Sequence, residues 1–208
     1  MVVFVFYYSR SYICSHYTEQ KVRIPINKIA SIQTGVYAKP SADGQLYYIQ
    51  ARHFDNNRRF IPTVKPEFPF NEKMEKHILQ RGDVLVAAKG YDRFAVAYSG
   101  LPRPAVASSM FIVLRITKMD KLLPEYLAWF INHPKTQSIL SGSSKGTALP
   151  SVTKDDVGNL EILVPSVEKQ RSVLKVYELF QKERELKLKL DTLSTSKVQQ
   201  QIFNAISE

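Results

Sequence analysis

The chain has 208 residues, of which 44% are hydrophobic and 23% are charged, a balance that is typical of a folded globular protein and excludes a disordered tail. Its formal net charge of +10, from 29 basic and 19 acidic residues, favours a polyanionic partner, and nucleic acid is the commonest one. The single cysteine, Cys14, excludes an internal disulfide, and nothing indicates an oxidising compartment.

The positive charge is unevenly distributed along the chain. Residues 166–208 hold eight basic and six acidic residues, which leaves 21 basic and 13 acidic residues in 1–165. The first 165 residues therefore carry a net charge of +8, and the last segment is nearly balanced. On charge alone, a basic but merely solvated surface is an equally good explanation.

Residues 1–20 are rich in aromatic side chains and show no clear period. They predict either an additional strand or an N-terminal extension that the fold does not use. Their apolar run, Val2–Tyr8, is too short to span a bilayer, and no basic segment precedes it. We therefore expect a cytoplasmic protein with no membrane partner.

The next segment predicts a strand and a helix. Residues 21–24 read as a short strand. Ile26, Ile29 and Ile32 then recur at helical spacing, and Gly35 is a plausible helix stop.

The middle of the chain is rich in strand signals. Residues 56–72 contain three prolines and little periodicity, so they predict a loop-rich insertion over a sheet. β-Rich or apolar runs predict further strands in 45–54, on either side of a polar corner in 82–100, and in 108–116.

Two shorter helices are expected after these strands. One begins near Pro124, and His133-Pro134 divides it into two pieces. The other is capped by Thr153, with Asp156 three residues later.

The C-terminal segment predicts a strand and then one long helix. Residues 160–164 alternate apolar side chains on one face, and Ser166 is a suitable cap for the helix. That helix runs from Val167 to about Ile206, roughly 60 Å at about 1.5 Å per residue.

A row of leucines along one face of this helix, the leucine seam, predicts pairing with another helix. It consists of Leu179, Leu186, Leu190 and Leu193, with charged residues on either side. We expect an intermolecular helix pair. The alternative is a helix that breaks at Ser194 and folds back on its own domain.

Residue patterns that carry chemistry are absent from the sequence. No glycine-rich loop has the spacing of a nucleotide-binding motif, and no tetrapeptide of the type that holds adenine in methyltransferases occurs. The four histidines are scattered, and one cysteine gives no zinc pattern. We therefore expect no catalytic residues, no metal and no cofactor.

Three polar corners interrupt the apolar strands, in residues 35–44, 49–59 and 87–93, and residues 141–146 add further serine and lysine side chains. Arginine and amide side chains can read base edges, and lysine, serine and backbone N–H groups can hold phosphates. Each residue also has an explanation without DNA. Tyr91 could pack within the protein, and His53 could be a hydrogen-bonded structural histidine. Arg58 and Arg59 could be solvated surface residues. The candidate DNA-binding residues are Tyr37, Lys39, Gln50, Arg52, His53, Lys89, Gly90, Tyr91, Arg93, Ser143, Ser144 and Lys145.

Three segments in this order resemble the DNA-specificity (S) subunit of type I restriction-modification systems. They are "INKIASIQTG", "GDVLVAAKG" and "KGTALPSVTKDDVGNLEILVPSVEKQRSVL". The last is similar to that family's glycine-containing corner, short helix, strand and helix opening around Glu-Lys-Gln. The resemblance covers residues 21–206.

The resemblance implies an α/β (α+β) target recognition domain with a mixed sheet in 21–165, and a dimerising spacer helix of coiled-coil type in 166–208. Complete S subunits carry two of each, so the chain resembles a half-subunit, and residues 1–20 match nothing in the family. The resemblance further implies a non-catalytic reader of one DNA half-site, joined to a second reader by the helix.

The implied partners are double-stranded DNA, a methyltransferase (modification) subunit, a restriction subunit and a second half, either an identical copy or another chain. Catalysis and S-adenosylmethionine would belong to the modification subunit. The competing interpretation is a protein-interaction or antirestriction-type regulator that uses the same scaffold without binding DNA.

Overall fold

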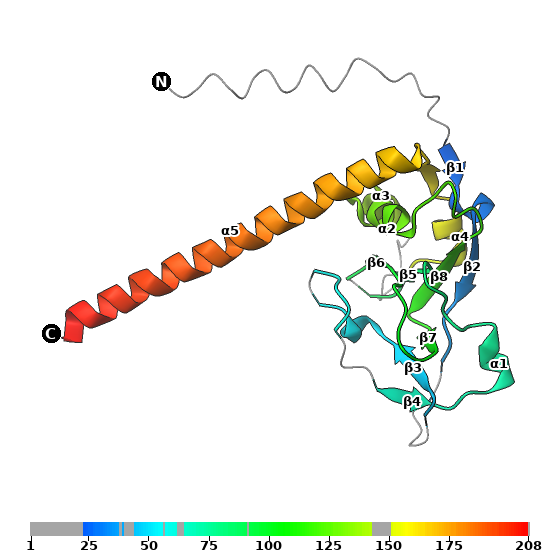
Figure 1. Ribbon diagram of the computed structural model, residues 1–208, viewed down its shortest axis with the longest axis horizontal. Coiled ribbons are helices and arrows are strands. Elements are labelled where there is room, and N and C mark those ends of the chain that lie inside the picture. Colours follow the sequence, from blue (N-terminus) through cyan, green and yellow to red (C-terminus); the bar gives the residue numbers. More distant parts are fainter. Residues whose placement is uncertain are drawn as a thin grey trace, which may run out of the picture.

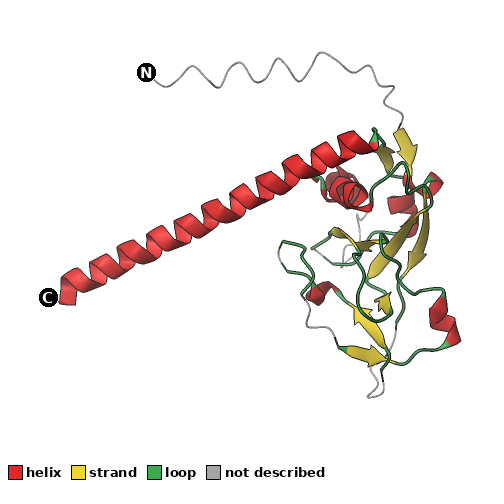
Figure 2. Ribbon diagram, in the orientation of Figure 1, coloured by secondary structure: helices red, strands yellow, loops and turns green. Residues whose placement is uncertain are grey.

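The computed structural model describes residues 23–37, 39, 44–55, 57–61, 65–90, 92–142 and 151–207. Figure 1 shows two parts, a body that holds the strands and short helices and one long helix that leaves it. We call residues 23–165 the body and helix α5, Val167–Ser207, the rod. Every described strand belongs to the body (Figure 2).

A four-stranded antiparallel sheet forms the centre of the body. Its order is β2-β8-β5-β6, with bounds Ala30–Thr34, Phe111–Ile116, Val84–Ala87 and Ala95–Ala97. A second sheet has the order β4-β3-β7, with bounds Pro66–Phe68, Leu46–Ile49 and Ala105–Ala107. A third pairs β1 with β9, Arg23–Pro25 with Glu161–Leu163.

The pairing of β3 with β7 is parallel, whereas the other strand pairs are antiparallel. The sheets are therefore mixed, and a long C-terminal helix follows them. This arrangement confirms the predicted fold class.

The two central strands are buried on both faces. In β5, Val84 and Val86 join the core beneath α2, while Leu85 and Ala87 face the core on the β3 side. Because both faces are covered, these strands are continuous apolar runs and do not alternate with polar residues.

Six short helical segments surround the sheets within the described residues, and the structure confirms two of the predicted helix boundaries. His133 has an extended backbone, with ψ of 136°, so Pro134 separates α2 from α3. The N–H of Asp156 donates to Thr153 Oγ1 at 3.1 Å, which caps α4. The α-helical bounds are Glu72–Glu75 (α1), Pro124–Asn132 (α2), Pro134–Gly142 (α3) and Lys154–Gly158 (α4), and Ala51–His53 is a 3-10 turn.

The predicted helix through Ile26, Ile29 and Ile32 is wrong. Only Ile26–Lys28 is helical, as a single 3-10 turn, and the chain then enters β2. Ile32 pairs with Leu114 of β8, so long-range sheet pairing overrides the helical spacing.

One glutamine fixes the foot of the rod to the body. Gln170 is fully buried, and its Oε1 accepts the N–H of Leu123 at 2.9 Å. Its Nε2 donates to the carbonyls of Lys121 at 2.6 Å and Pro165 at 2.8 Å. A buried amide with all these partners holds the first turn of α5 against the loop before α2.

Beyond its foot the rod is exposed. From Lys175 to Ile206 every side chain is exposed except that of Gln181, which is partly so. The helix continues without a break through Ser194, so the alternative of a fold-back at that residue is wrong. Within the described residues no helix combines the length and apolar character needed to cross a membrane.

Candidate nucleic-acid interface

The ends of three strands meet on one side of the body. After β2, the N–H of Val36 donates to the carbonyl of Ala107 in β7 at 2.8 Å. After β7, the N–H of Ser108 donates to the carbonyl of Ile49, the last residue of β3, at 2.8 Å. The first polar corner follows β2 and the second follows β3, so these bonds bring both corners to one edge.

The backbones approach most closely at Gly35. A Cβ atom there would lie 2.1 Å from the carbonyl oxygen of Ser108, which is far inside van der Waals contact. The N–H of Gly35 also donates to the carbonyl of Phe111 at 2.9 Å. Gly35 is therefore not the predicted helix stop. Its missing side chain lets the first corner touch the β7–β8 turn.

The third corner joins the same edge from β5. The N–H of Ala88 donates to the carbonyl of Met110 at 2.9 Å. Lys89 pairs with Ser151 in an isolated antiparallel bridge. Ser151 is the first described residue after 143–150, so the chain re-enters the described structure beside Lys89.

An ion pair connects the second corner with the third. Both Nη atoms of Arg58 donate to the carboxylate of Asp92, at 2.7 Å and 2.5 Å. The same guanidinium lies 4.6 Å from the ring centre of Phe94. The hydrogen bonds from Arg58 hold the pKa of Asp92 below its ordinary value. The ring of Phe54 packs edge-on against Phe94, with 5.5 Å between centroids, and supports this contact.

A second ion pair connects the second corner with the rod. Arg59 Nη2 lies 2.9 Å from Glu185 Oε2, and Nη1 lies 3.3 Å from Oε1. The hydrogen bond to Glu185 raises the pKa of Arg59. Arg58 and Arg59 are thus both paired, although the side chain of Arg59 is still 61% exposed. We had not predicted that this corner touches α5.

The candidate residues differ in how they are presented. The side chain of Tyr37 is 77% exposed, and Lys39, Arg52 and Lys89 are exposed. These residues flank the converging strand ends and are open to a partner. Their contact with DNA stays a prediction.

The other candidates are more constrained. His53 Nδ1 accepts the N–H of Gln50 at 3.1 Å, which holds the ring against the backbone of the second corner. Arg93 is partly buried and donates to Ser141 Oγ at the end of α3. Gly90 has φ of 101°, a left-handed conformation that suits glycine. Tyr91, Ser143, Ser144 and Lys145 lie outside the described residues.

The sequence reasoning missed the β7–β8 turn as part of this edge. Met110 in this turn is 38% exposed beside the third corner. Ser108 is buried, and its Oγ has no hydrogen-bond partner among the described residues. The polar Ser108-Ser109 pair between two apolar strands could have indicated this turn, but we included both residues in the strand predicted for 108–116.

The described part of this edge offers no metal site, and its candidate residues carry charged and polar groups. Within the described ranges, no group of three or more histidine, cysteine or acidic side chains could hold a metal ion. The exposed candidate groups, Tyr37, Lys39, Arg52 and Lys89, are cationic or aromatic, and the exposed carboxylate of Asp92 is paired with Arg58. Cationic and aromatic groups bind phosphates and contact base edges.

No family model and no curated protein matches the sequence. Solved structures do match. One, from work on complex assembly and conformational transition of the type I R-M system, has a TM-score of 0.61 and 22% identity over 80% of this chain. The HsdS subunit from Thermoanaerobacter tengcongensis has a TM-score of 0.60 and 21% identity over 80% of this chain. The type I restriction-modification S subunit from M. genitalium has a TM-score of 0.50 and 12% identity over 77% of this chain.

The chain spans less than half of each of these proteins, at 43%, 43% and 39% of their lengths. At these identities the likeness concerns the fold. The described chain therefore has the fold of part of a type I S subunit, one sheet-containing body followed by a long helix.

Proposed function

We propose that this chain is a non-catalytic DNA-reading subunit of a type I restriction-modification complex, in which the body reads one half-site. The observation that carries the proposal is the meeting of three polar corners at one edge of a body with strong positive charge. The likeness in fold to S subunits supports it. Residues 21–165 would act as the recognition domain and 166–208 as the spacer helix.

The rod joins two readers in this proposal. Its exposed leucines, Leu179, Leu186, Leu190 and Leu193, pair antiparallel with the rod of a second copy in a two-fold symmetric dimer. The two bodies then contact the duplex at two half-sites separated by a gap that neither reads. The complex directs the methyltransferase and restriction subunits, which supply the chemistry, to this split site.

Methylation mapping tests the whole proposal. The chain is expressed with its cognate modification subunit in a host free of DNA methylation, and the genome is sequenced for modified adenines. We expect one split, palindromic site. A split but asymmetric site would mean that the second half is a different chain. Unmodified DNA, with both proteins soluble and associated, would contradict the proposal and favour a protein-interaction regulator.

Salt-dependent duplex binding tests the edge itself. Replacing an exposed lysine that holds a phosphate should lower the slope of log affinity against log salt by about 0.9. We expect this change for Lys89→Gln. The matched control is Lys175→Gln, which removes the same charge from the rod and should leave the slope unchanged. Equal slopes for Lys89→Gln and the original chain would remove Lys89 from the interface.

A further inference from the structure

The tip of the second corner reaches from the body to the rod of the same chain. Its described residues are Asp55, Asn57, Arg58 and Arg59, and hydrogen bonds among them close the turn. The N–H of Asp55 donates to the carbonyl of Arg59 at 2.9 Å, and the N–H of Arg58 donates to the carbonyl of Asp55 at 2.9 Å. Asp55 Oδ1 also accepts the N–H groups of Asn57 and Arg59, both at 2.8 Å. The tip therefore has a defined shape on which its two arginines are presented.

Arg58 ties this tip to the third corner. Its backbone is left-handed, with φ of 63°, and no other non-glycine residue that the structure describes has a positive φ. A left-handed backbone costs free energy for an arginine, so it persists only where the surrounding contacts hold it. The contacts here are the two hydrogen bonds to Asp92 and the ring of Phe94 under the guanidinium. Arg58 thus fixes one side of the tip, and the next residue is left for another partner.

Arg59 connects the other side of the tip to the rod. Its two Nη atoms donate to the two carboxylate oxygens of Glu185, across 126 residues of sequence. A fork of this kind fixes direction as well as distance, which a contact between two point charges does not. Both side chains remain largely exposed, so burial does not hold them together. The paired geometry is what makes an exposed contact of this kind count.

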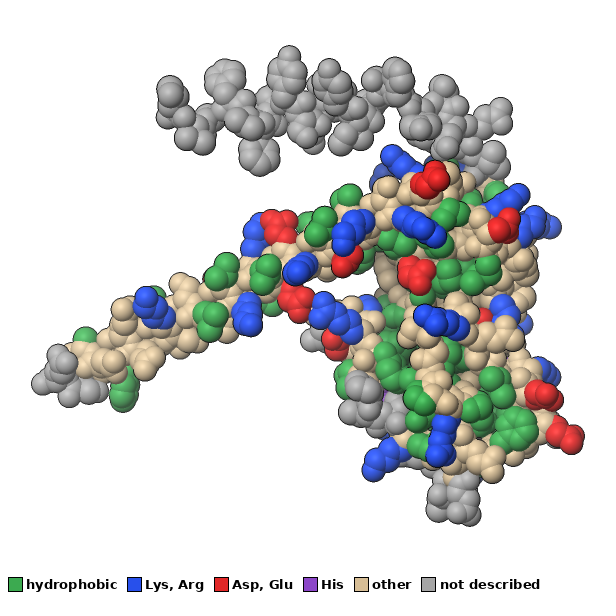
Figure 3. Space-filling view, viewed as in Figure 1, with side chains coloured by type: hydrophobic (Ala, Val, Ile, Leu, Met, Phe, Trp, Pro, Cys, Tyr) green, Lys and Arg blue, Asp and Glu red, His purple; other side chains and the backbone are tan. Residues whose placement is uncertain are grey.

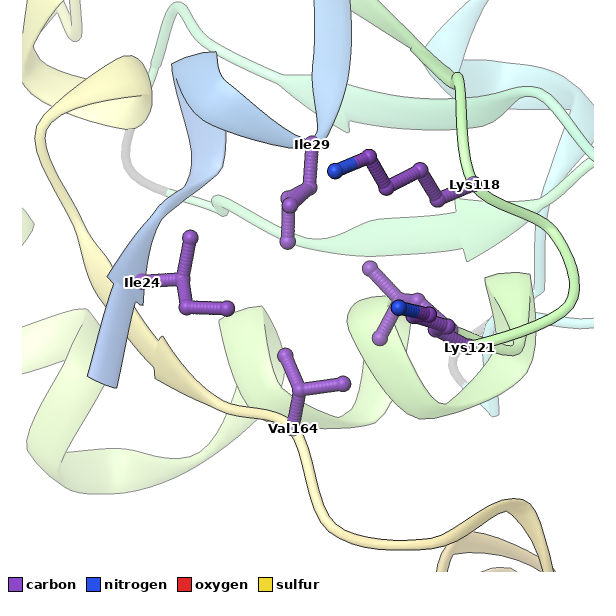
Figure 4. A pocket seen from close by; sticks show the side chains of 6 residues that line it. Ile24, Ile29, Lys118, Lys121 and Val164 are labelled. Atoms are coloured by element: carbon purple, nitrogen blue, oxygen red, sulfur yellow. The ribbon is translucent and has the colours of Figure 1, made fainter. Parts of the chain in front are cut away.

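The foot of the rod leaves room for a change of angle. Gln170 fixes the first turn of α5, but a hollow of about 110 Å³ lies beside the segment that leads into it. The hollow is lined by Ile24, Ile29, Lys118, Lys121, Leu122 and Val164. Figure 4 shows the isoleucine and valine side chains around this space, with the two lysines along one side. An empty space provides no atoms that resist a shift of Val164.

A contact far from the foot has more control over the direction of the rod. Glu185 lies about 22 Å along the helix from Gln170, so a small tilt at the foot becomes a larger displacement there. The pair between Arg59 and Glu185 opposes this displacement at the point where it is large. The rod is therefore held at two separate places, its foot and Glu185.

We propose that Arg59 and Glu185 are positioning residues that hold the reading edge and the rod as one rigid unit. Arg59 acts through Glu185 in this role and does not itself contact DNA. The contacts run from the rod through the tip of the second corner to Asp92 in the third corner. In the dimer proposed above, the angle between body and rod then sets the gap between the half-sites, and this consequence rests on that proposed function.

Distances within one chain test the contact without DNA. Spin labels are attached at Asn57→Cys and Gln199→Cys in the full chain carrying Cys14→Ser. The labelled protein is diluted with unlabelled chain, so that only distances within one chain are measured. We expect a narrow distribution of distances. Glu185→Gln should broaden this distribution at least about twofold, because the uncharged side chain no longer holds the tip against the rod.

Two further variants show whether the effect belongs to this pair. Glu183→Gln removes the same charge, but Glu183 pairs with Lys187 on the rod itself, so the distribution should stay narrow. Arg59→Glu combined with Glu185→Arg restores the pair with its charges exchanged and should return the narrow distribution. A narrow distribution for Glu185→Gln alone, or a broad one for the exchanged pair, would overturn the positioning role.

Methylation mapping of the same variants, each expressed with the modification subunit, tests the consequence for DNA. The original chain and the exchanged pair should modify sites with a single gap. Glu185→Gln should lose this restriction and also modify sites with longer or shorter gaps. A single gap for Glu185→Gln would show that the pair does not set the spacing and would overturn that part of the proposal.

Duplex binding separates positioning from direct contact. If Arg59 held a phosphate, Glu185→Gln would free it and bind DNA more tightly, and the exchanged pair would lose affinity and salt dependence. That result would overturn the assignment of Arg59 to positioning. Unmodified DNA from the original chain would contradict the proposed function, and the distance measurement would still decide whether Arg59 and Glu185 hold the two parts together.

Discussion

The body and the rod contain the same apolar residue types in opposite surroundings. Leu85 and Leu114 in the body are fully buried, whereas Leu186 and Leu190 in the rod are 53% and 66% exposed. Figure 3 shows hydrophobic side chains in the open along the rod, between lysines, arginines and acidic residues. Burial in the body stabilises the chain's own fold. The same side chains on the rod contribute nothing until another surface covers them.

The ion pairs of the two parts differ in the same way. Asp83 in the body is 2% exposed and makes two hydrogen bonds to Arg115, at 2.8 Å and 2.7 Å. Lys187 and Glu183 on the rod are exposed neighbours one helical turn apart. An exposed pair of this kind is worth about 0.3–0.5 kcal/mol, whereas breaking a buried pair costs several times more. The body is held by tertiary contacts, and the rod within one chain mainly by its own helix.

The largest effect is expected on the seam of the rod. Leu186→Asp should raise the dimer dissociation constant by about a hundredfold or more, because two-fold pairing brings the two introduced charges face to face. The unfolding of the body should be unchanged. Sedimentation velocity measures the first quantity and urea denaturation the second.

Leu188→Asp is the matched control for the seam, because Leu188 is 71% exposed on another face of the same turn. It should leave the dimer intact. If Leu186→Asp has the dissociation constant of the original dimer, Leu186 does not lie in the dimer contact. The exposed leucines of the rod would then not be explained by pairing of two rods.

The second largest effect is expected on the stability of the body, at the ion pair between Asp83 and Arg115. Asp83→Ala should lower the free energy of unfolding by about 3–5 kcal/mol, because it leaves the partly buried guanidinium of Arg115 without its carboxylate. Urea denaturation measures the loss. Asp92→Ala removes a carboxylate that is 72% exposed and should cost less than about 1 kcal/mol. Equal losses would show that burial does not decide the strength of these pairs.

A smaller effect is expected where the strand ends meet. Gly35→Ala should cost about 1–3 kcal/mol, because its Cβ would force the backbone away from the carbonyl of Ser108. Duplex affinity should fall as the first corner shifts. Gly142→Ala is the control, since nothing lies within 4 Å of a Cβ at that position. A Gly35→Ala protein with unaltered stability would contradict the close approach.

Local signals in the sequence were enough to predict much of the fold. The capping pair Thr153 and Asp156, the break at His133-Pro134 and the long helix after Ser166 all depend on neighbouring residues, and the structure confirms them. The prediction for the residues of strand β2 was wrong because the spacing of the isoleucines fits a helix locally. The pairing of β2 with β8, in which Ile32 lies opposite Leu114, decides the outcome.

The arrangement of the candidate edge depends on long-range contacts. The polar corners could be seen in the sequence, but the parallel pairing of β3 with β7 that brings them together has no local signature. Arg59 and Glu185 are 126 residues apart, and their pairing follows from the direction in which the rod leaves the body. The residue types of the edge could therefore be read from the sequence, and their geometry could not.

The unbroken rod has a consequence for how its length can change. Each residue of a helix adds a fixed rise and a fixed rotation, so an arbitrary insertion would turn the leucine stripe away from its partner. Steps of seven residues keep the stripe nearly in phase, and each adds about 10 Å, the length of roughly three base pairs. In the proposed dimer, a seven-residue insertion in the rod would therefore lengthen the distance between the two half-sites while keeping the leucine stripe on its partner.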